Sequence, residues 1–113
     1  MDIQENLPLT ESTFFILLSL ATGPKHGYAI MKDVKALSEN RVSLSTGTLY
    51  GAIKRLLDQG WILRVDEPSQ NESAHDRKAY LLTQRGRRIL EAETARLGKL
   101  YQVAQLRTAQ EEV

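Results

Sequence analysis

The chain of 113 residues contains no cysteine. This absence excludes disulfide bonds and any metal site built from thiolates, and it is typical of proteins in a reducing cytoplasm. We also expect no secretory leader, because the N-terminal residues put no positive charge before the apolar stretch FFILLSLA. That stretch is far shorter than the roughly 20 residues that cross a bilayer. We therefore expect a cytoplasmic protein without a membrane span.

Motifs of catalysis and of cofactor binding are missing as well. Neither histidine stands in a metal-ligand spacing such as H-E-x-x-H, and no glycine pattern of the Walker or dinucleotide type is present. Ser45 lacks the strand-to-helix nucleophile elbow of a catalytic serine. The sequence thus predicts no enzymatic activity, no metal and no cofactor.

The net excess of charge of either sign is small, but the charged residues are unevenly distributed along the chain. The net charge of +1 argues against a general polyanion binder. Residues 25–88 nevertheless hold twelve Lys and Arg against seven Asp and Glu, whereas the two ends together hold three against seven. A basic middle between acidic ends is typical of a localised nucleic-acid surface.

Two helices are predicted in the first third of the chain. Residues 11–22 are apolar on nearly all sides, with Thr10 as the cap and Gly23 as the stop. Such a helix must be covered from more than one direction. The second helix spans residues 28–37, where apolar side chains recur at helical spacing.

The remaining elements are a third helix, a hairpin and a long last helix. A short strand is predicted at 42–44, and the third helix begins after the cap Ser45 and ends at Gly60. In the segment WILRVDE, Trp61, Leu63 and Val65 alternate with polar or outward positions as in a half-buried strand, and KAYLLT is its partner. The last helix would run from residue 84, capped by Thr83, to about residue 110.

This order predicts a mainly α fold with a small β-hairpin, namely a winged helix-turn-helix followed by a long C-terminal helix. A chain of this length can bury one core. We expect an N-terminal extension at 1–9, the winged helix-turn-helix domain at 10–83 and a dimerisation helix at 84–113.

The third helix carries a thin polar side, which we call the reading face. Stepping 100° per residue from the buried stripe places six residues opposite it, with Tyr50 on the flank: Gly47, Thr48, Gly51, Lys54, Arg55 and Asp58. Glycine and threonine let a helix approach base edges in a groove about 12 Å wide. The hydroxyls of Ser45, Thr46 and Thr48 can bind phosphate or bases. The alternative is that small polar residues merely cap a surface helix.

Two flanking segments add cations to this surface. The hairpin loop ends in His75, Arg77 and Lys78, which would contact the DNA backbone or the minor groove unless they are simply solvated. Lys25 and His26 stand at the start of the second helix, where a phosphate can be met. A structural hydrogen bond is the alternative role of His26.

The last helix, about 40 Å long, exceeds what the small domain can cover. Its apolar strip, interrupted by Glu93, and the apolar first helix predict burial against a second copy of the chain. The predicted dimerisation residues are Phe14, Leu17, Leu90, Leu97, Leu100, Tyr101 and Ala104. The alternative is a helix that folds back on its own domain.

Three segments together, GPKHGYAIMKDV, STGTLYGAIKRLLDQGWI and RKAYLLTQRGRRIL, resemble the PadR family of bacterial transcriptional regulators. The resemblance covers about residues 14–90. It implies a homodimeric repressor that binds a palindromic double-stranded DNA operator and releases it when a small aromatic or drug-like effector binds. It also implies that residues 46–50 with Lys54 read DNA and that Arg77 and Lys78 form the wing contact. Many relatives have proline at the positions of Thr46 and Gly51. Its absence here loosens the start of the reading helix, so the resemblance does not extend to operator preference.

The effector site is not indicated by any motif. Trp61 and Tyr101 are candidates for stacking on such a molecule, although aromatic side chains at these spacings more often pack in a core. The competing function is a winged helix that binds proteins and never DNA, because fold alone does not establish activity. Salt separates the two, since DNA affinity falls by about 0.9 log unit per decade of salt for each phosphate contact.

Overall fold

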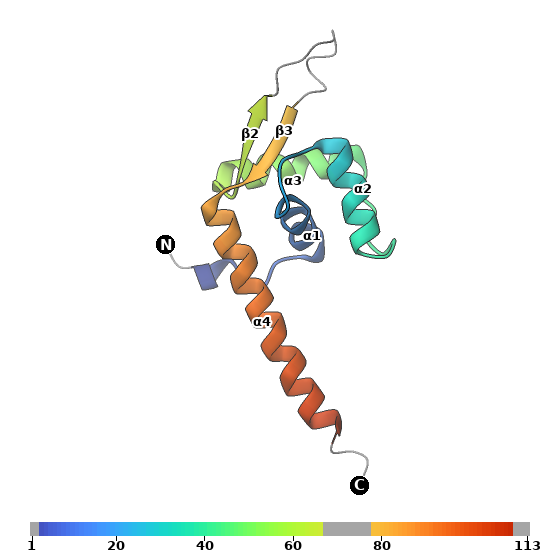
Figure 1. The fold of residues 1–113 in the computed structure, drawn as a ribbon, viewed down its shortest axis with the longest axis vertical. Helices are drawn as coiled ribbons and strands as arrows, with labels where there is room; N and C mark the ends of the chain where they lie inside the picture. The colour runs from blue at the N-terminus through green and yellow to red at the C-terminus, as the bar shows by residue number, and fades with distance from the viewer. Residues whose placement is uncertain (1–2, 67–77, 110–113) are drawn as a thin grey trace.

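The computed structural model describes residues 3–66 and 78–109. Its elements follow one another as shown in Figure 1: a 3-10 turn η1 (Ile3–Asn6), then α1 (Glu11–Leu20), β1 (Lys25–His26), α2 (Gly27–Leu37), α3 (Thr46–Gln59), β2 (Ile62–Asp66), β3 (Lys78–Leu82) and α4 (Gln84–Ala109). Mainly helical content with a small antiparallel sheet confirms the predicted fold class.

Side-chain caps begin three of the helices, as the sequence predicts. The Thr10 and Ser45 hydroxyls each accept a hydrogen bond from the backbone N–H three residues later, at 3.1 Å in both cases. The Thr83 hydroxyl accepts one from the Gly86 N–H at 3.0 Å. Gly60 ends α3 in the left-handed conformation, with φ of 76°, which glycine adopts without steric cost.

The sheet has the order β1-β3-β2 and is antiparallel throughout. The strand predicted at 42–44 is wrong: this segment forms no strand, and the Val42 N–H is instead bound by the Ser38 hydroxyl at 2.9 Å. The third strand is Lys25–His26, which pairs with β3. Lys25 and His26 are too few and too polar to show the alternation by which a strand is predicted. They pair because β3 has an edge that β2 does not occupy.

The alternation expected in the hairpin also needs correction. Trp61 precedes β2, and Ile62 is fully buried as its first residue. Leu63 therefore lies on the opposite side of the strand and is 55% exposed, although the pattern had placed it inward. A shift of one residue in the start of a strand exchanges its two faces.

The core surrounds α1, whose apolar sides are covered by α2, α4 and β3 of the same chain. Its fully buried side chains include Ile16 and Leu17 from α1, Ile30 from α2, Leu56 from α3 and Ile89 from α4. The two-sided cover predicted for α1 is thus supplied within the chain.

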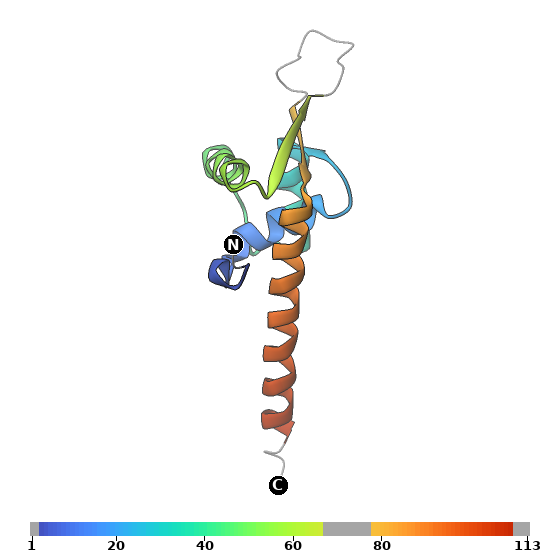
Figure 2. The ribbon, with the colours of Figure 1, turned by 90° about the vertical axis from the view of Figure 1, so that its left-hand side faces the viewer.

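The helix α4 contacts the domain only over its first part. Gly86, Ile89, Leu90 and Glu93 are its buried residues, and at Gly86 a side chain would overlap the Trp61 carbonyl and the Leu82 side chain. Beyond Glu93 every described residue of α4 is exposed except Arg96, which is half-buried. Figures 1 and 2 show the helix extending well away from the domain.

Candidate nucleic-acid interface

The helix α3 turns one side into the core and leaves the opposite side exposed. Leu49, Ala52, Ile53 and Leu56 are buried, and the residues predicted to form the reading face are all exposed. In Figure 2, α3 lies at the outer edge of the domain, on the side away from α4. An elongated macromolecule can therefore approach α3 without contacting α4.

Gly47 and Gly51 have no structural reason to be glycine within the chain. A Cβ at either position would meet no atom within 4 Å, and neither has a positive φ. Glycine in a helix costs about 1 kcal/mol relative to alanine. The open space above both residues is what close approach by another molecule requires.

The hydroxyl residues at the start of α3 have different local roles. Ser45 is occupied as the cap, and its hydroxyl also donates to the Thr48 hydroxyl at 2.9 Å. Thr46 and Thr48 are exposed in the first turn. The first N–H groups of a helix lack intrahelical partners and bear partial positive charge, so this end of α3 suits a phosphate.

Tyr50 links α3 to the start of α2. Its ring is 45% exposed, and its hydroxyl lies so close to Gly27 that any Cβ there would overlap it. The glycine that the sequence marks only as a helix entry therefore allows this close approach of Tyr50, and a side chain there would require Tyr50 to move.

The cations of α3 are not equivalent. Lys54 is exposed and forms no hydrogen bond or ion pair with any residue that the structure describes. The Arg55 guanidinium instead donates to the Thr13 hydroxyl of α1 at 3.1 Å. Of these two cations, Lys54 is the one whose charge is available to an external anion.

The cations flanking α3 are partly engaged within the chain. The Lys25 ammonium donates to the Ser19 carbonyl at 2.6 Å and to the Thr22 hydroxyl at 2.8 Å. The His26 Nδ1 lies 3.1 Å from the Lys78 carbonyl, which is the structural role named as its alternative. Lys78 itself is exposed, whereas His75 and Arg77 lie outside the described residues.

One exposed aromatic residue beside this surface was missed by sequence reasoning. Tyr28, in the first turn of α2, is 70% exposed, and the Lys32 ammonium lies 5.6 Å from the centre of its ring. Tyr28 directly follows Gly27 in the segment HGY, but nothing in the sequence marks its side chain as exposed.

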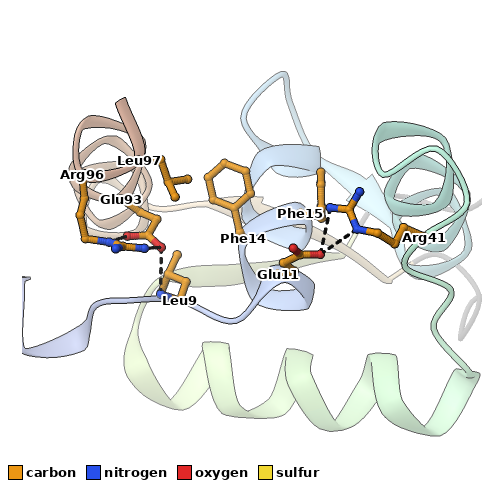
Figure 3. Close-up of a pocket in the computed structure, with 8 residues that line it drawn as sticks. All are labelled: Leu9, Glu11, Phe14, Phe15, Arg41, Glu93, Arg96 and Leu97. Carbon is orange, nitrogen blue, oxygen red and sulfur yellow. Dashed lines mark hydrogen bonds and ion pairs between the residues drawn. The ribbon is translucent and has the colours of Figure 1, made fainter. Parts of the chain in front are cut away.

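A second surface lies between α1 and α4. It contains a pocket of about 330 Å³, drawn in Figure 3, that combines aromatic and apolar walls with two arginine–glutamate pairs. Its lining residues are Leu9, Glu11, Phe14, Phe15, Arg41, Glu93, Arg96 and Leu97. Arg41 pairs with Glu11 at 3.0 Å, and Arg96 pairs with Glu93 at 2.6 Å.

The predicted dimerisation residues fall into three groups by burial. Leu17 and Leu90 are 0% and 5% exposed, so packing inside their own chain withdraws them from direct contact with a second copy. Phe14 is half-buried at the pocket. The others are exposed on α4: Leu97, Leu100, Tyr101 and Ala104, joined by Val103 and Leu106.

The two aromatic candidates for effector stacking also separate. Trp61 is 5% exposed and belongs to the core, whereas Tyr101 is 63% exposed on α4. Within the described ranges 3–66 and 78–109, no group of acidic residues or histidines is placed to hold a metal ion. No helix in the same ranges is long and apolar enough to span a membrane.

A helical domain with a three-stranded antiparallel sheet, a polar exposed helix and a hairpin beside it is a winged-helix protein. The model of the transcriptional regulator PadR-like family matches residues 16–92. The chain therefore belongs to the PadR-like family of transcriptional regulators.

Two solved PadR structures and one curated protein are similar to this chain. A PadR family transcription regulator from hypervirulent Clostridium difficile is 25% identical, with a TM-score of 0.72 over 86% of this chain and 97% of the other. Bacillus subtilis PadR, solved in complex with operator DNA, is 26% identical, with a TM-score of 0.65 over 76% of this chain and 46% of the other. A 37.1 kDa protein in a transposon of Streptomyces fradiae is 32% identical over 90 residues, and the chain matches about a quarter (24%) of its length.

Proposed function

We propose that this protein is a sequence-specific DNA-binding regulator that inserts the reading face of α3 into the major groove. The observation that supports this most directly is the exposed, glycine-thinned side of α3 with the unengaged Lys54. The operator DNA bound by Bacillus subtilis PadR supports the same partner for this chain. Thr46 and Thr48 contact phosphate or base edges at the leading end, and Lys54 contacts phosphate further along.

The hairpin and the start of α2 provide flanking contacts. Lys78, with Arg77, meets the backbone beside the groove, and the exposed Tyr28 and Lys32 lie near the first turn of α2. Lys25 and His26 act mainly by holding the strand β1 in place, because their polar atoms already have partners. Arg55 contributes chiefly through its bond to α1.

A homodimer brings two reading faces to one operator. The exposed apolar strip on α4 cannot be covered by the part of the domain that the structure describes, and a second copy offers the same strip in return. Two-fold symmetry then requires a palindromic site with half-sites about 34 Å apart or a multiple of that distance.

We further propose a finer regulatory role, which the resemblance to the PadR family supports. The protein acts as a repressor, and a small aromatic or drug-like effector binds near α1 and α4, where the pocket of Figure 3 has two phenylalanines and two arginines. Such a molecule releases DNA only if it binds the DNA-free arrangement more tightly. Loss of DNA binding on titration with aromatic acids would show this, and unchanged affinity across the series would contradict it.

The decisive experiment is selection of bound fragments from the source genome, followed by affinity measurements on the selected site. We expect Lys54→Ala to weaken binding about tenfold and to lower the salt slope by about one phosphate contact. Combination with Arg77→Ala should weaken binding further and leave dimerisation intact. Lys99→Ala, on the exposed part of α4, is the matched control. Full operator affinity in the double variant, or recovery of no DNA, would contradict the proposal.

A further inference from the structure

Glu93 is the last buried residue of α4, and it is a charged one. It is 2% exposed. Its carboxylate accepts hydrogen bonds from the Leu9 N–H at 3.1 Å and from Arg96 Nε and Nη2 at 2.6 and 2.9 Å. Figure 3 shows this carboxylate between the N-terminal segment and α4. The bond from Arg96 is the largest of the effects that hold the pKa of Glu93 below its usual value, so the group remains ionised.

The position is one where the helix pattern predicts an apolar side chain. Gly86, Ile89, Leu90 and Glu93 form one stripe at spacings of three and four residues, and the first three pack against the domain. A buried ion pair is often no more stabilising than a well-packed apolar residue. It differs in being directional, because its hydrogen bonds require a defined distance and angle. The glutamate thus differs from an apolar residue in fixing the geometry between the Leu9 N–H, Arg96 and α4.

The residues just before α1 and in its first turn also contact α3, the helix that carries the reading face. Leu9 precedes the cap Thr10, whose hydroxyl donates to the Thr13 hydroxyl at 3.0 Å. Arg55 of α3 donates to that Thr13 hydroxyl at 3.1 Å. Residues 9–13 are thus hydrogen-bonded to α4 through Glu93 and to α3 through Arg55. A defined polar path connects the helix proposed to read DNA with the helix proposed to dimerise.

We infer that Glu93 is a positioning residue: it fixes the direction in which the exposed part of α4 leaves the domain, and thereby the separation of the two reading faces in a dimer. This inference rests on the proposed function for its DNA consequence. Residues 94–109 extend the helix by about 24 Å beyond Glu93. A tilt of about 10° at Glu93 moves the far end by roughly 4 Å, which is close to the rise of one base pair.

Two variants separate positioning from folding. Glu93→Gln keeps the size of the side chain and removes its charge. Glu93→Leu continues the apolar stripe but removes the acceptor of the Leu9 N–H and of Arg96, so we expect chemical denaturation to show a cooperative transition at a lower denaturant concentration than for the unmodified chain. Glu91→Gln is the matched control, because Glu91 is exposed on the same helix.

The first measurement requires no DNA. Because the chain has no cysteine, spin labels can be placed uniquely at Asp58→Cys on α3 and Lys99→Cys on α4. Labelled chains are mixed with excess unlabelled chain, so that the distances measured by double electron–electron resonance are those between two labels in one chain. We expect one narrow distance distribution for the chain with Glu93 and for Glu91→Gln, and a broadened or shifted one for both Glu93 variants. Unchanged distributions in folded Glu93→Leu would overturn the inference.

The second measurement uses operators whose half-site spacing changes by single base pairs. The chain with Glu93 should prefer its best spacing about tenfold over the neighbouring spacings, and Glu93→Leu should lose most of that preference while still binding. The same ranking of spacings in both would overturn the inference. If the unmodified chain binds no DNA, the proposed function fails, and the distance measurement still decides the role of Glu93.

Discussion

At the scale of single residues, four helical glycines can be compared by what a side chain would meet. Gly86 is required by the chain itself, because a Cβ would overlap the Trp61 backbone carbonyl, whereas a Cβ at Gly27 would require the end of the Tyr50 side chain to move. Gly47 and Gly51 have open space above them. Each glycine lowers the stability of the helix relative to alanine, and no contact within the described chain offsets this loss. An external partner at α3 accounts for both positions.

Gly51→Ala should therefore stabilise the fold and weaken DNA binding. We expect the free energy of unfolding to rise by about 0.5–1 kcal/mol, as for glycine to alanine in an exposed helix. Operator affinity should fall about tenfold, because the added methyl group keeps the helix from the base edges. Denaturant unfolding and fluorescence anisotropy measure the two effects.

Gly86→Ala is the matched comparison, since it also adds one methyl group to a helical glycine. Overpacking there should lower the free energy of unfolding by about 1–3 kcal/mol and leave the affinity of the folded protein unchanged. A Gly51→Ala variant that binds DNA as well as the original chain would remove Gly51 from the reading face.

At the scale of elements, α3 and α4 differ in how much of their apolar stripe is buried within the chain. In α3 the apolar stripe is buried by its own domain, and only the polar side is exposed. In α4 the stripe is buried up to Glu93 and then continues into solvent through Leu100, which is 54% exposed, and Tyr101, which is 63% exposed. Apolar side chains repeated on one exposed side of a helix indicate an interface.

Leu100→Glu should disrupt dimerisation while leaving the winged-helix domain folded. Burying a carboxylate opposite its symmetry mate is strongly unfavourable, so we expect the dimer dissociation constant to rise at least about a hundredfold. Analytical ultracentrifugation measures it. Gln102→Glu adds the same charge away from the apolar strip and should change little. Equal dissociation constants for the two variants would place the interface elsewhere.

At the scale of the whole molecule, the proposal concerns two copies on one duplex. Half a helical turn inserted between half-sites turns one of them to the opposite side of the DNA. An insertion of five base pairs should thus reduce affinity to that of a single half-site, a loss of at least about a hundredfold. Titration of the two operators under equal salt tests this. Equal affinity for both would show that the copies bind independently.

The sequence by itself determined the local elements and their caps. Thr10, Ser45, Gly60 and Thr83 act as their side chains or backbone preferences predict, and the polar side of α3 is exposed as its spacing requires. These properties depend on neighbours within a few residues, which a sequence shows directly. The family was likewise recognisable from short motifs, and the match over residues 16–92 confirmed it.

Only the tertiary structure decided which segments meet. Pairing of Lys25–His26 with β3, the burial of Leu17 and Leu90, the bond from Arg55 to Thr13 and the contact of Glu93 with Leu9 all join distant parts of the chain. The last of these joins residues 84 positions apart. Helical periodicity shows which side of an element is apolar, but not what covers it, because that depends on packing in three dimensions.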